Sequence, residues 1–449
     1  MQFTYGISHF ERDRGSFPAL PLVNLVTESE TSEELPSLLS RPGLQLEGTT
    51  MGTGPVTALF ASDGAVSGEL FGISGGKAYE GTDELGTVAG TGHSNIVGFE
   101  EFVFFNAGSN VYSYDGTVYQ TLAFPDGAAV KAIAVGASRL IAIRNNTGTF
   151  YWSDILSDVI DPLSFATAEN SPDKLQDLLY FGDRLILFGS DTIEFWASSG
   201  DQDAPFIPTI GMVYSRGIKN TGACTTFNSG FAWVTDLNQI CVNDPNTVIS
   251  NPDLCSKIRD SASVKLWTLV VDGMELLCLR LTDRSYVYNS TTGLWSEFTS
   301  YGETNWVCQC GTQEVFGSSL NGAIYEWNYG DYSDFGGELE RRFRAWAPVT
   351  EGNVPLDSVH LRVAPGLTTV LVGDDANPKV ELRISPDGGS TWKEWLSRSL
   401  GLSGQYRKTV RWNSLGSYGY PGVLLEFRVT APVPFRMSGL YGNQPGGNM

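Results

Sequence analysis

Few residues in this 449-residue chain have the types and spacing that enzymatic or metal chemistry needs. Cys308 and Cys310 form a Cys-x-Cys pair, half of a metal site, but no second cysteine or histidine pair stands at ligand spacing. The histidines, His9, His93 and His360, lie far apart in the sequence. No phosphate-binding glycine loop, H-E-x-x-H pair or G-x-S-x-G nucleophile elbow occurs. The sequence therefore predicts no catalytic residue, no cofactor-binding residue and no metal ligand.

One segment has a defined turn chemistry. Residues 385–392 read S-P-D-G-G-S-T-W, which fits the Asp-box pattern of sialidase propellers. In such a turn the carboxylate accepts hydrogen bonds from its own loop, the glycines allow positive φ, and the tryptophan packs beneath the hairpin. We predict a structural turn made by Ser385, Asp387, Gly389, Thr391 and Trp392. A sialidase would also need an arginine cluster for the substrate carboxylate, and residues 56–330 are poor in arginine.

Charge divides the chain into two unlike parts. Residues 338–449 hold 13 Lys+Arg and 10 Asp+Glu; the whole chain holds 29 and 50, so residues 1–337 hold 16 and 40. The balance is +3 against −24. A body with this negative charge repels polyphosphate, which argues against DNA binding by the larger part. An acidic surface would instead suit a conduit in which DNA slides without sticking; the alternative is that acidity only keeps the protein soluble.

The elements that would position these residues are strands and turns. Apolar anchors of similar hairpins begin at Leu70, Phe102, Leu140, Leu185, Phe231, Leu276 and Val315, with gaps of 32, 38, 45, 46, 45 and 39 residues. This period is typical of β-propeller blades. A short helix is expected over 256–267, and no run approaches the ~18 apolar residues of a membrane span.

The fold class predicted is all-β: a distorted β-propeller of six or seven blades followed by a small C-terminal β-sandwich. Residues 1–55 are expected to be an extended N-terminal segment, 56–330 the propeller and 338–449 the sandwich. The basic run Arg341, Arg342 and Arg344 comes where the charge changes sign. We interpret it as a strand that meets an acidic neighbour, in the same chain or in another copy, with phosphate binding as the alternative.

Several glycine-rich segments carry a family resemblance. They are 21–28 (PLVNLVTE), 39–44 (LSRPGL), 75–81 (GGKAYEG), 86–92 (GTVAGTG), 188–195 (FGSDTIEF) and 216–218 (RGI). The chain resembles, over about residues 20–235 and more loosely beyond, the tail hub or nozzle proteins of short-tailed bacteriophages, also called packaged-DNA stabilisation proteins. The matching segments are structural signatures and include no catalytic set.

The resemblance implies a non-enzymatic virion protein, assembled in the host cytoplasm, that forms a six-fold ring in the tail. Its expected partners are other copies, the portal adaptor (head-to-tail connector), and tail fibre, spike or needle proteins. DNA would be retained by the ring and ejected through it without specific binding. Asp201, Asp203, Asp331 and Asp334 are candidate residues of acidic loops that line the channel. A carbohydrate-active, sialidase-like propeller enzyme and a peptide-binding interaction propeller remain the alternatives.

Overall fold

The computed structural model describes residues 4–5, 8–11, 18–29, 36–61, 66, 70–168, 172–313 and 315–443. Strands dominate these residues, and their only α-helix is α1, Pro252–Asp260. The helix begins after Asn251, whose side chain accepts a hydrogen bond from the Leu254 amide at 2.9 Å. It therefore starts earlier than the helix expected over 256–267, whose last four residues belong to strand β26. None of the described helices is long and apolar enough to cross a membrane.

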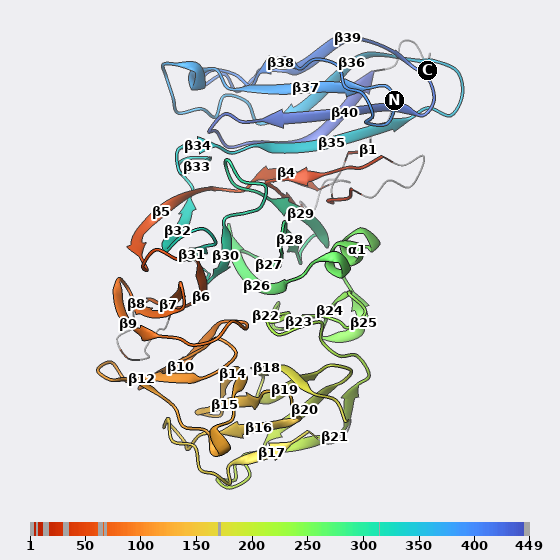
Figure 1. The fold of residues 1–449 in the computed structure, drawn as a ribbon. Helices are drawn as coiled ribbons and strands as arrows, with labels where there is room; N and C mark the ends of the chain where they lie inside the picture. The colour runs from red at the N-terminus through yellow and green to blue at the C-terminus, as the bar shows by residue number, and fades with distance from the viewer. Residues whose placement is uncertain are drawn as a thin grey trace.

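Seven four-stranded antiparallel blades make up the propeller, the lower part of Figure 1. Blade one contains β6 (Val56–Ala61), β7 (Leu70–Ser74), β8 (Lys77–Glu80) and β9 (Asp83–Thr87). Blade two contains β10 (Asn95–Phe99), β11 (Phe102–Asn106), β12 (Val111–Tyr114) and β13 (Tyr119–Thr121), followed by the 3-10 turn η1 (Pro125–Gly127). Blade three contains β14 (Val130–Gly136), β15 (Arg139–Arg144), β16 (Thr149–Trp152) and β17 (Phe165–Thr167). Blade four contains β18 (Leu175–Phe181), β19 (Arg184–Gly189), β20 (Ile193–Ser198) and β21 (Phe206–Tyr214).

The last three blades complete the ring. Blade five contains β22 (Cys224–Phe227), β23 (Gly230–Val234), β24 (Ile240–Val242) and β25 (Asp244–Val248). Blade six contains β26 (Val264–Val271), β27 (Met274–Leu281), β28 (Ser285–Asn289) and β29 (Leu294–Phe298). Blade seven contains β30 (Cys308–Gly311), β31 (Val315–Ser318), β32 (Ala323–Asn328) and β5 (Gly43–Thr50). The first strand of each blade contacts the first strand of the next, and β30 contacts β6, so the ring closes.

Each of the seven sequence anchors lies in the second strand of a blade, which confirms the propeller and gives seven blades among the described residues. The N-terminal segment differs from the expectation. β5 lies inside 1–55, yet it is the outermost strand of blade seven, where Leu44 opposes Trp327. The last three strands of the repeat region, β30 to β32, need a fourth strand to complete the blade, and β5 from the N-terminal part of the chain is that strand.

Two further sheets pack on one another at the top of Figure 1. One contains β35 (Arg341–Pro348), β40 (Gly422–Val429), β37 (Lys379–Ser385) and β38 (Leu396–Ser399), with β1 (Thr4–Tyr5) beside β35. The other contains β3 (Leu25–Glu28), β4 (Ser37–Ser40), β41 (Arg436–Asn443), β36 (Val354–Val363) and β39 (Val410–Tyr418). Both sheets contribute to one apolar core that includes Leu25, Phe343, Trp412 and Phe427. We call them the C-terminal sheets.

Short strands join the C-terminal sheets to the propeller. β2 (Leu22–Val23) pairs with blade six through Val23 and Glu297, and with β35 through Leu22 and Phe343. Blade six and one C-terminal sheet therefore form a single ten-stranded sheet. β33 (Ser333–Asp334) likewise pairs with β5 and with β34 (Gly337–Glu338), while the 3-10 turn η2 (Asp374–Ala376) lies in a loop before β37. Backbone hydrogen bonds thus tie the propeller to a C-terminal sheet through β2, whereas β33 and β34 extend the sheet of blade seven.

Candidate functional site

A cleft of about 1500 Å³ lies between the propeller and the C-terminal sheets. Its walls carry charges of both signs, from Glu11, Arg284 and Glu297 on one side to Arg342, Lys379 and Arg428 on the other. Glu11 of the N-terminal segment and Val23 of β2 also line the cleft, so the N-terminal segment, the propeller and the C-terminal sheets meet here. This junction is the candidate functional site.

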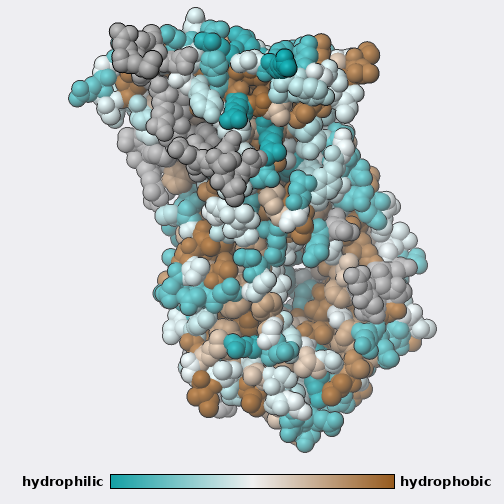
Figure 2. Space-filling view, turned by 180° about the vertical axis from the view of Figure 1, so that it is seen from behind, coloured by the Kyte–Doolittle hydropathy of each residue, from teal (hydrophilic) through white to brown (hydrophobic). Residues whose placement is uncertain are grey.

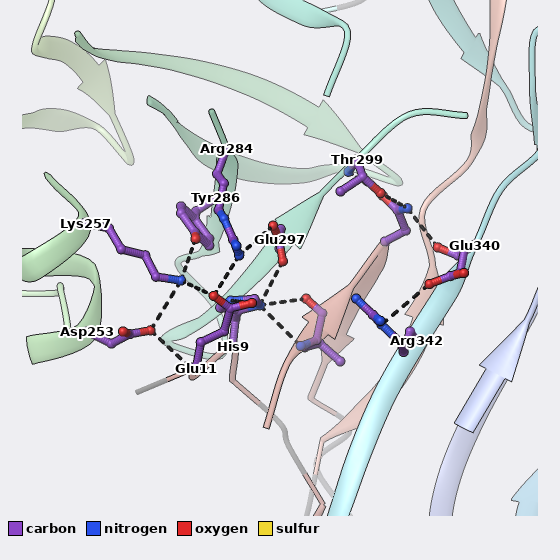
Figure 3. A network of polar contacts seen from close by, with 12 residues as sticks. His9, Glu11, Asp253, Lys257, Arg284, Tyr286, Glu297, Thr299, Glu340 and Arg342 are labelled. Atoms are coloured by element: carbon purple, nitrogen blue, oxygen red, sulfur yellow. Dashed lines mark hydrogen bonds and ion pairs between the residues drawn. The ribbon is translucent and has the colours of Figure 1, made fainter. Parts of the chain in front are cut away.

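A network of polar contacts organises the propeller side of the junction (Figure 3). Glu11 accepts hydrogen bonds from Lys257 Nζ at 2.6 Å and from Arg284 Nη1 at 2.7 Å, both on Oε2. Lys257 comes from α1 and Arg284 precedes β28, so Glu11 ties the N-terminal segment to two parts of the propeller. Asp253 strengthens the same tie, because its carboxylate accepts a hydrogen bond from the Glu11 amide at 3.0 Å.

Burial and charge set the protonation of this network. Burial acts to raise the pKa of Glu11, but the hydrogen bond from Lys257 and the surrounding charges lower it to about 2. Burial lowers the pKa of His9 to about 3, so its imidazole is neutral at neutral pH. The approaches of His9 to Glu11 at 3.9 Å and to Glu297 at 3.7 Å are therefore not ion pairs.

His9, Glu11 and Glu297 place one possible ligand atom each within 4.8 Å of one another, which raises the question of a metal ion. A neutral imidazole and two carboxylates suit several divalent metals. However, Glu11 is already neutralised by Lys257 and Arg284, and these two fixed cations would repel a metal ion. The donor set fits an ion-pair network better than a metal centre. The sequence prediction of no metal ligand stays a prediction.

Glu297 gives the network a measurable pH dependence. Burial raises its pKa from 4.5 to about 7, although Arg284 Nη1 lies 3.4 Å from Oε1 and favours the ionised form. A pKa that is higher in the folded protein stabilises the fold at low pH, and this contribution is lost as the pH rises through 7. Glu297→Gln removes it. The unfolding free energy of Glu297→Gln relative to wild type should rise by about 1–3 kcal/mol between about pH 4.5 and pH 8.

Urea unfolding of both proteins across this pH range measures the difference. The exposed Glu101 supplies a control, and the pH dependence of Glu297→Gln is compared with that of Glu101→Gln. A flat difference for Glu297→Gln would mean that burial does not perturb this carboxyl.

The candidate channel residues do not form one set. Asp334 is fully buried and forms an ion pair with Arg41 at 2.7 Å, so its assignment to a channel loop is wrong. Its carboxylate is held inside because Arg41, equally buried, neutralises it. Asp201 and Asp203 are exposed on the β20–β21 loop, where Asp201 accepts the amides of Asp203 and Ala204. Asp331 is half-buried and accepts the Ser333 hydroxyl at 2.7 Å.

The basic strand also turns inward. Arg341 is buried and donates to the carbonyls of Val429, Ala431 and Val433, so it is not available to another copy. Arg344 forms an ion pair with the buried Glu426. Arg342 lies 3.5 Å from Glu340 at the cleft. The interpretation of this strand as an inter-subunit surface is therefore wrong for Arg341; the acidic neighbours of Arg342 and Arg344 are in the same chain.

The Asp-box residues form a compact turn after β37. Asp387 accepts the Thr391 amide at 2.8 Å and its hydroxyl at 2.6 Å, and Ser385 Oγ accepts the Gly389 amide at 2.8 Å. The hydrogen bonds from Thr391 hold the pKa of Asp387 near 2. Trp392 is half-buried, and the guanidinium groups of Arg344 and Arg383 lie over its ring at 4.9 and 4.5 Å from the centroid.

Sequence reasoning did not find the residues that build the junction. Arg41, His9, Glu11 and Glu297 stand in unrelated segments, and no spacing rule connects them. One signal was available for Arg41. It stands in the apolar segment 36–44, between strands, where an isolated charge demands a partner.

Comparison with known proteins gives the family. Residues 3–328 match the sequence model described as "Bacteriophage P22 Gp10, beta-propeller". Tail hub protein gp10 of Salmonella phage P22 is 24% identical over 307 residues, which cover 61% of this chain and 62% of that protein. This chain thus aligns with less than two thirds of that relative's length.

Two solved structures are similar at low identity. The structure of BBS1N in complex with ARL6DN is matched at 12% identity with a TM-score of 0.41, covering 66% of this chain and 98% of that one. The Raptor structure from Chaetomium thermophilum is matched at 8% identity with a TM-score of 0.41, covering 65% and 29%. The family match covers most of the chain and every blade of the propeller. The chain belongs to the family of phage P22 Gp10 β-propeller proteins.

Proposed function

We propose that this protein is a structural component of a phage tail, a hub or nozzle that retains packaged DNA and conducts it during ejection. The observation that carries the proposal is the similarity to the tail hub protein gp10 of phage P22. We further propose that it acts in the virion tail, after assembly in the host cytoplasm, as a six-fold ring. Its partners would be the portal adaptor and the tail fibre, spike or needle proteins.

We place the DNA path between copies and not along the axis of one propeller. Side chains of the inner strands link the blades around that axis: Lys265 Nζ donates to the Thr57 carbonyl and Gln309 Nε2 to the Val56 carbonyl, each at 2.8 Å. Lys131 likewise contacts Gln176 on the next blade. We propose that DNA runs along the acidic outside of several propellers. Asp201, Asp203 and Asp331 remain proposed residues of that path.

The geometry gives no support to an enzyme. The carbohydrate-active alternative rests on the Asp-box hairpin. This hairpin follows β37 in the C-terminal sheets, and the Asp387 carboxylate accepts hydrogen bonds from Thr391 of the same turn. The junction network ties three parts of the fold together, as a structural role requires. We therefore propose a non-enzymatic protein.

The test uses a phage that encodes this chain and a mutant that lacks its gene. We expect mutant heads to fill with DNA and then lose it, and the protein supplied from a plasmid to restore stable, infectious particles. DNase protection of the genome in purified particles measures retention. Particles that lack the protein yet keep and eject their DNA normally would exclude the proposed role.

A further inference from the structure

Four exposed cations gather at one edge of the C-terminal sheets. They are Arg398 on β38, Arg411 on β39, and Arg407 and Lys408 in the loop before β39. Arg398 Nε donates to the Arg411 carbonyl at 3.0 Å, Lys408 Nζ to Ser399 Oγ at 2.7 Å and Arg411 Nη2 to Ser358 Oγ at 3.2 Å. Within the described residues none of the four forms an ion pair. Their mutual repulsion is uncompensated in the single chain.

Apolar side chains are exposed on the loop that carries Arg407 and Lys408 and on a loop paired with it. The loops 364–373 and 400–408 are held side by side by hydrogen bonds from the Gly366 amide to the Leu400 carbonyl at 3.0 Å and from the Gly404 amide to the Gly366 carbonyl at 3.2 Å. Leu371, Val372 and Tyr406 on these loops are 77%, 86% and 69% exposed. We call the four cations and these three residues the C-terminal patch. Apolar groups rimmed by charge are typical of protein interfaces.

The opposite end of the molecule carries the complementary surface. The loop between β16 and β17 in blade three contains Asp154, Asp158 and Asp161 and no lysine or arginine. Its apolar side chains Val159 and Leu163 are 58% and 82% exposed. We call these five residues the propeller patch. Figure 1 places blade three at the bottom and the C-terminal sheets at the top, and Figure 2 shows hydrophobic surface at both ends.

The propeller patch is held in shape before any partner binds. The Asp154 amide donates to the Val159 carbonyl at 2.9 Å, and the Leu163 amide donates to Asp161 Oδ1 at 2.8 Å. Asp158 accepts Ser113 Oγ at 2.8 Å and Gln120 Nε2 at 3.0 Å from blade two. A preorganised loop loses little conformational entropy on binding, which favours a docking surface.

We propose that the C-terminal patch of one copy binds the propeller patch of the next copy. The charges are opposite, both patches have exposed apolar side chains, and within the described residues none of the charged side chains of either patch forms an ion pair in its own chain. The contact joins two different surfaces, so it propagates head to tail and closes into a ring when the rotation between copies permits. The acidic η2 residues Asp374 and Asp375 follow Val372 in the same loop. This inference deepens the proposed function and rests on it.

A protein partner fits the C-terminal patch better than DNA. Phosphate recognition needs cations and hydrogen-bond donors, whereas Leu371, Val372 and Tyr406 would gain nothing from a phosphate backbone. These three side chains gain from being removed from water against Val159 and Leu163. Duplex DNA is retained below as an outcome that would contradict the proposal.

The test uses two triple variants, each of which reverses the charge of one patch. Arg398→Glu/Arg407→Glu/Lys408→Glu changes the charge of the C-terminal patch from +4 to −2, and Asp154→Lys/Val159→Lys/Leu163→Lys changes that of the propeller patch from −3 to +1. Each is supplied alone to the gene-deficient phage. We expect on the order of a hundredfold fewer tails containing the protein in either case, because like charges then meet at the contact. Leu237→Lys/Leu320→Lys, at residues that are 51% and 56% exposed on other blades, is the control and should assemble as wild type.

The decisive experiment supplies both variants together. The acidic C-terminal patch of one variant meets the basic propeller patch of the other, and the two unaltered patches also meet, so an alternating ring with an even number of copies can close. We expect tails to be restored with both variants present in equal amounts. Quantitative mass spectrometry of purified tails measures the ratio.

Three outcomes would overturn the inference. If each variant supplied alone assembled like wild type, the contact between the two patches would be excluded. The proposed function would still hold in that case, provided that the wild-type protein is present in particles that retain their DNA. Failure of the mixture, with each variant also failing alone, would mean that the patches bind other tail proteins. Normal assembly of Arg398→Glu/Arg407→Glu/Lys408→Glu with loss of duplex DNA binding, measured by fluorescence polarisation, would assign the C-terminal patch to nucleic acid.

Discussion

Arg41→Met is expected to lower the free energy of unfolding by about 3–5 kcal/mol, because it leaves a buried carboxylate without its cation. Arg41 and Asp334 are both fully buried, with Arg41 Nη2 2.7 Å from Asp334 Oδ2. The same guanidinium donates to Asn24 Oδ1 at 3.0 Å and to the Thr299 carbonyl at 2.8 Å. Urea unfolding followed by circular dichroism measures the change, and a loss of soluble protein would be its extreme form.

Lys77→Met provides the matched control. Lys77 and Glu84 form an ion pair with the same 2.7 Å separation, but their side chains are 46% and 45% exposed. We expect a much smaller loss of stability for this variant, since water solvates the remaining carboxylate. The double variant Arg41→Met/Asp334→Asn should recover part of the loss, because no charge is then left buried. A cost for Arg41→Met no larger than that for Lys77→Met would contradict the account.

The position of Arg41 gives this pair a role in assembly as well as in stability. Asn24 follows β2, Thr299 follows blade six and Asp334 belongs to β33, so one side chain holds three connections between the propeller and the C-terminal sheets. The proposed contact between copies joins the far ends of these two parts. In a ring, the forces between neighbouring copies would therefore pass through this junction. A variant that weakens the junction should lower the stability of the ring before it unfolds the propeller.

The repeats could be predicted from the sequence because each blade has its own turn chemistry. The second strand of a blade is apolar and its turn is polar, so anchors such as Leu140 and Leu185 recur at nearly constant spacing. Blade number was left open between six and seven because the first gap is short. The structure explains it: blades one and two have short connections and still carry four strands each.

The closing strand of the propeller could not be predicted in the same way. β5 is a single strand with no repeat around it, and its partner β32 lies 283 residues away at the Leu44 and Trp327 pair. Propensity describes a strand but does not say which edge it joins. The period search therefore assigned residues 43–50 to an extended segment, although the unfilled edge of blade seven required a strand from elsewhere.

The charged residues were predicted least well, because burial decides their role. Arg341 and Asp334 read as surface charges in the sequence, yet both are inside, where carbonyls and Arg41 satisfy them. β35 alternates buried and half-buried positions, and the sequence does not say which face a second sheet covers. The exposed cations Arg407 and Lys408 belong to no motif with a defined chemistry, so the sequence pattern does not indicate a role for them.

Trp306→Ala is expected to cost about 3–5 kcal/mol of unfolding free energy, because it removes the centre of the aromatic cluster between blades six and seven. Trp306 is fully buried and stacks on Trp267 and Trp327, with ring centroids at 5.6 and 5.9 Å. Phe298 meets it edge on at 5.3 Å. The variant should weaken the packing between blades six and seven, next to β5, the N-terminal strand that completes blade seven.

Trp306→Phe tests how much of the alanine cost comes from the cavity left by the side chain. The indole Nε1 of Trp306 has no hydrogen-bond partner among the described residues, so phenylalanine gives up no hydrogen bond and keeps most of the apolar contact. We expect less than about half of the alanine cost. Urea unfolding of the three proteins measures both changes. Equal costs for alanine and phenylalanine would mean that the indole stack as a whole, and not the filling of the seam, holds blades six and seven together.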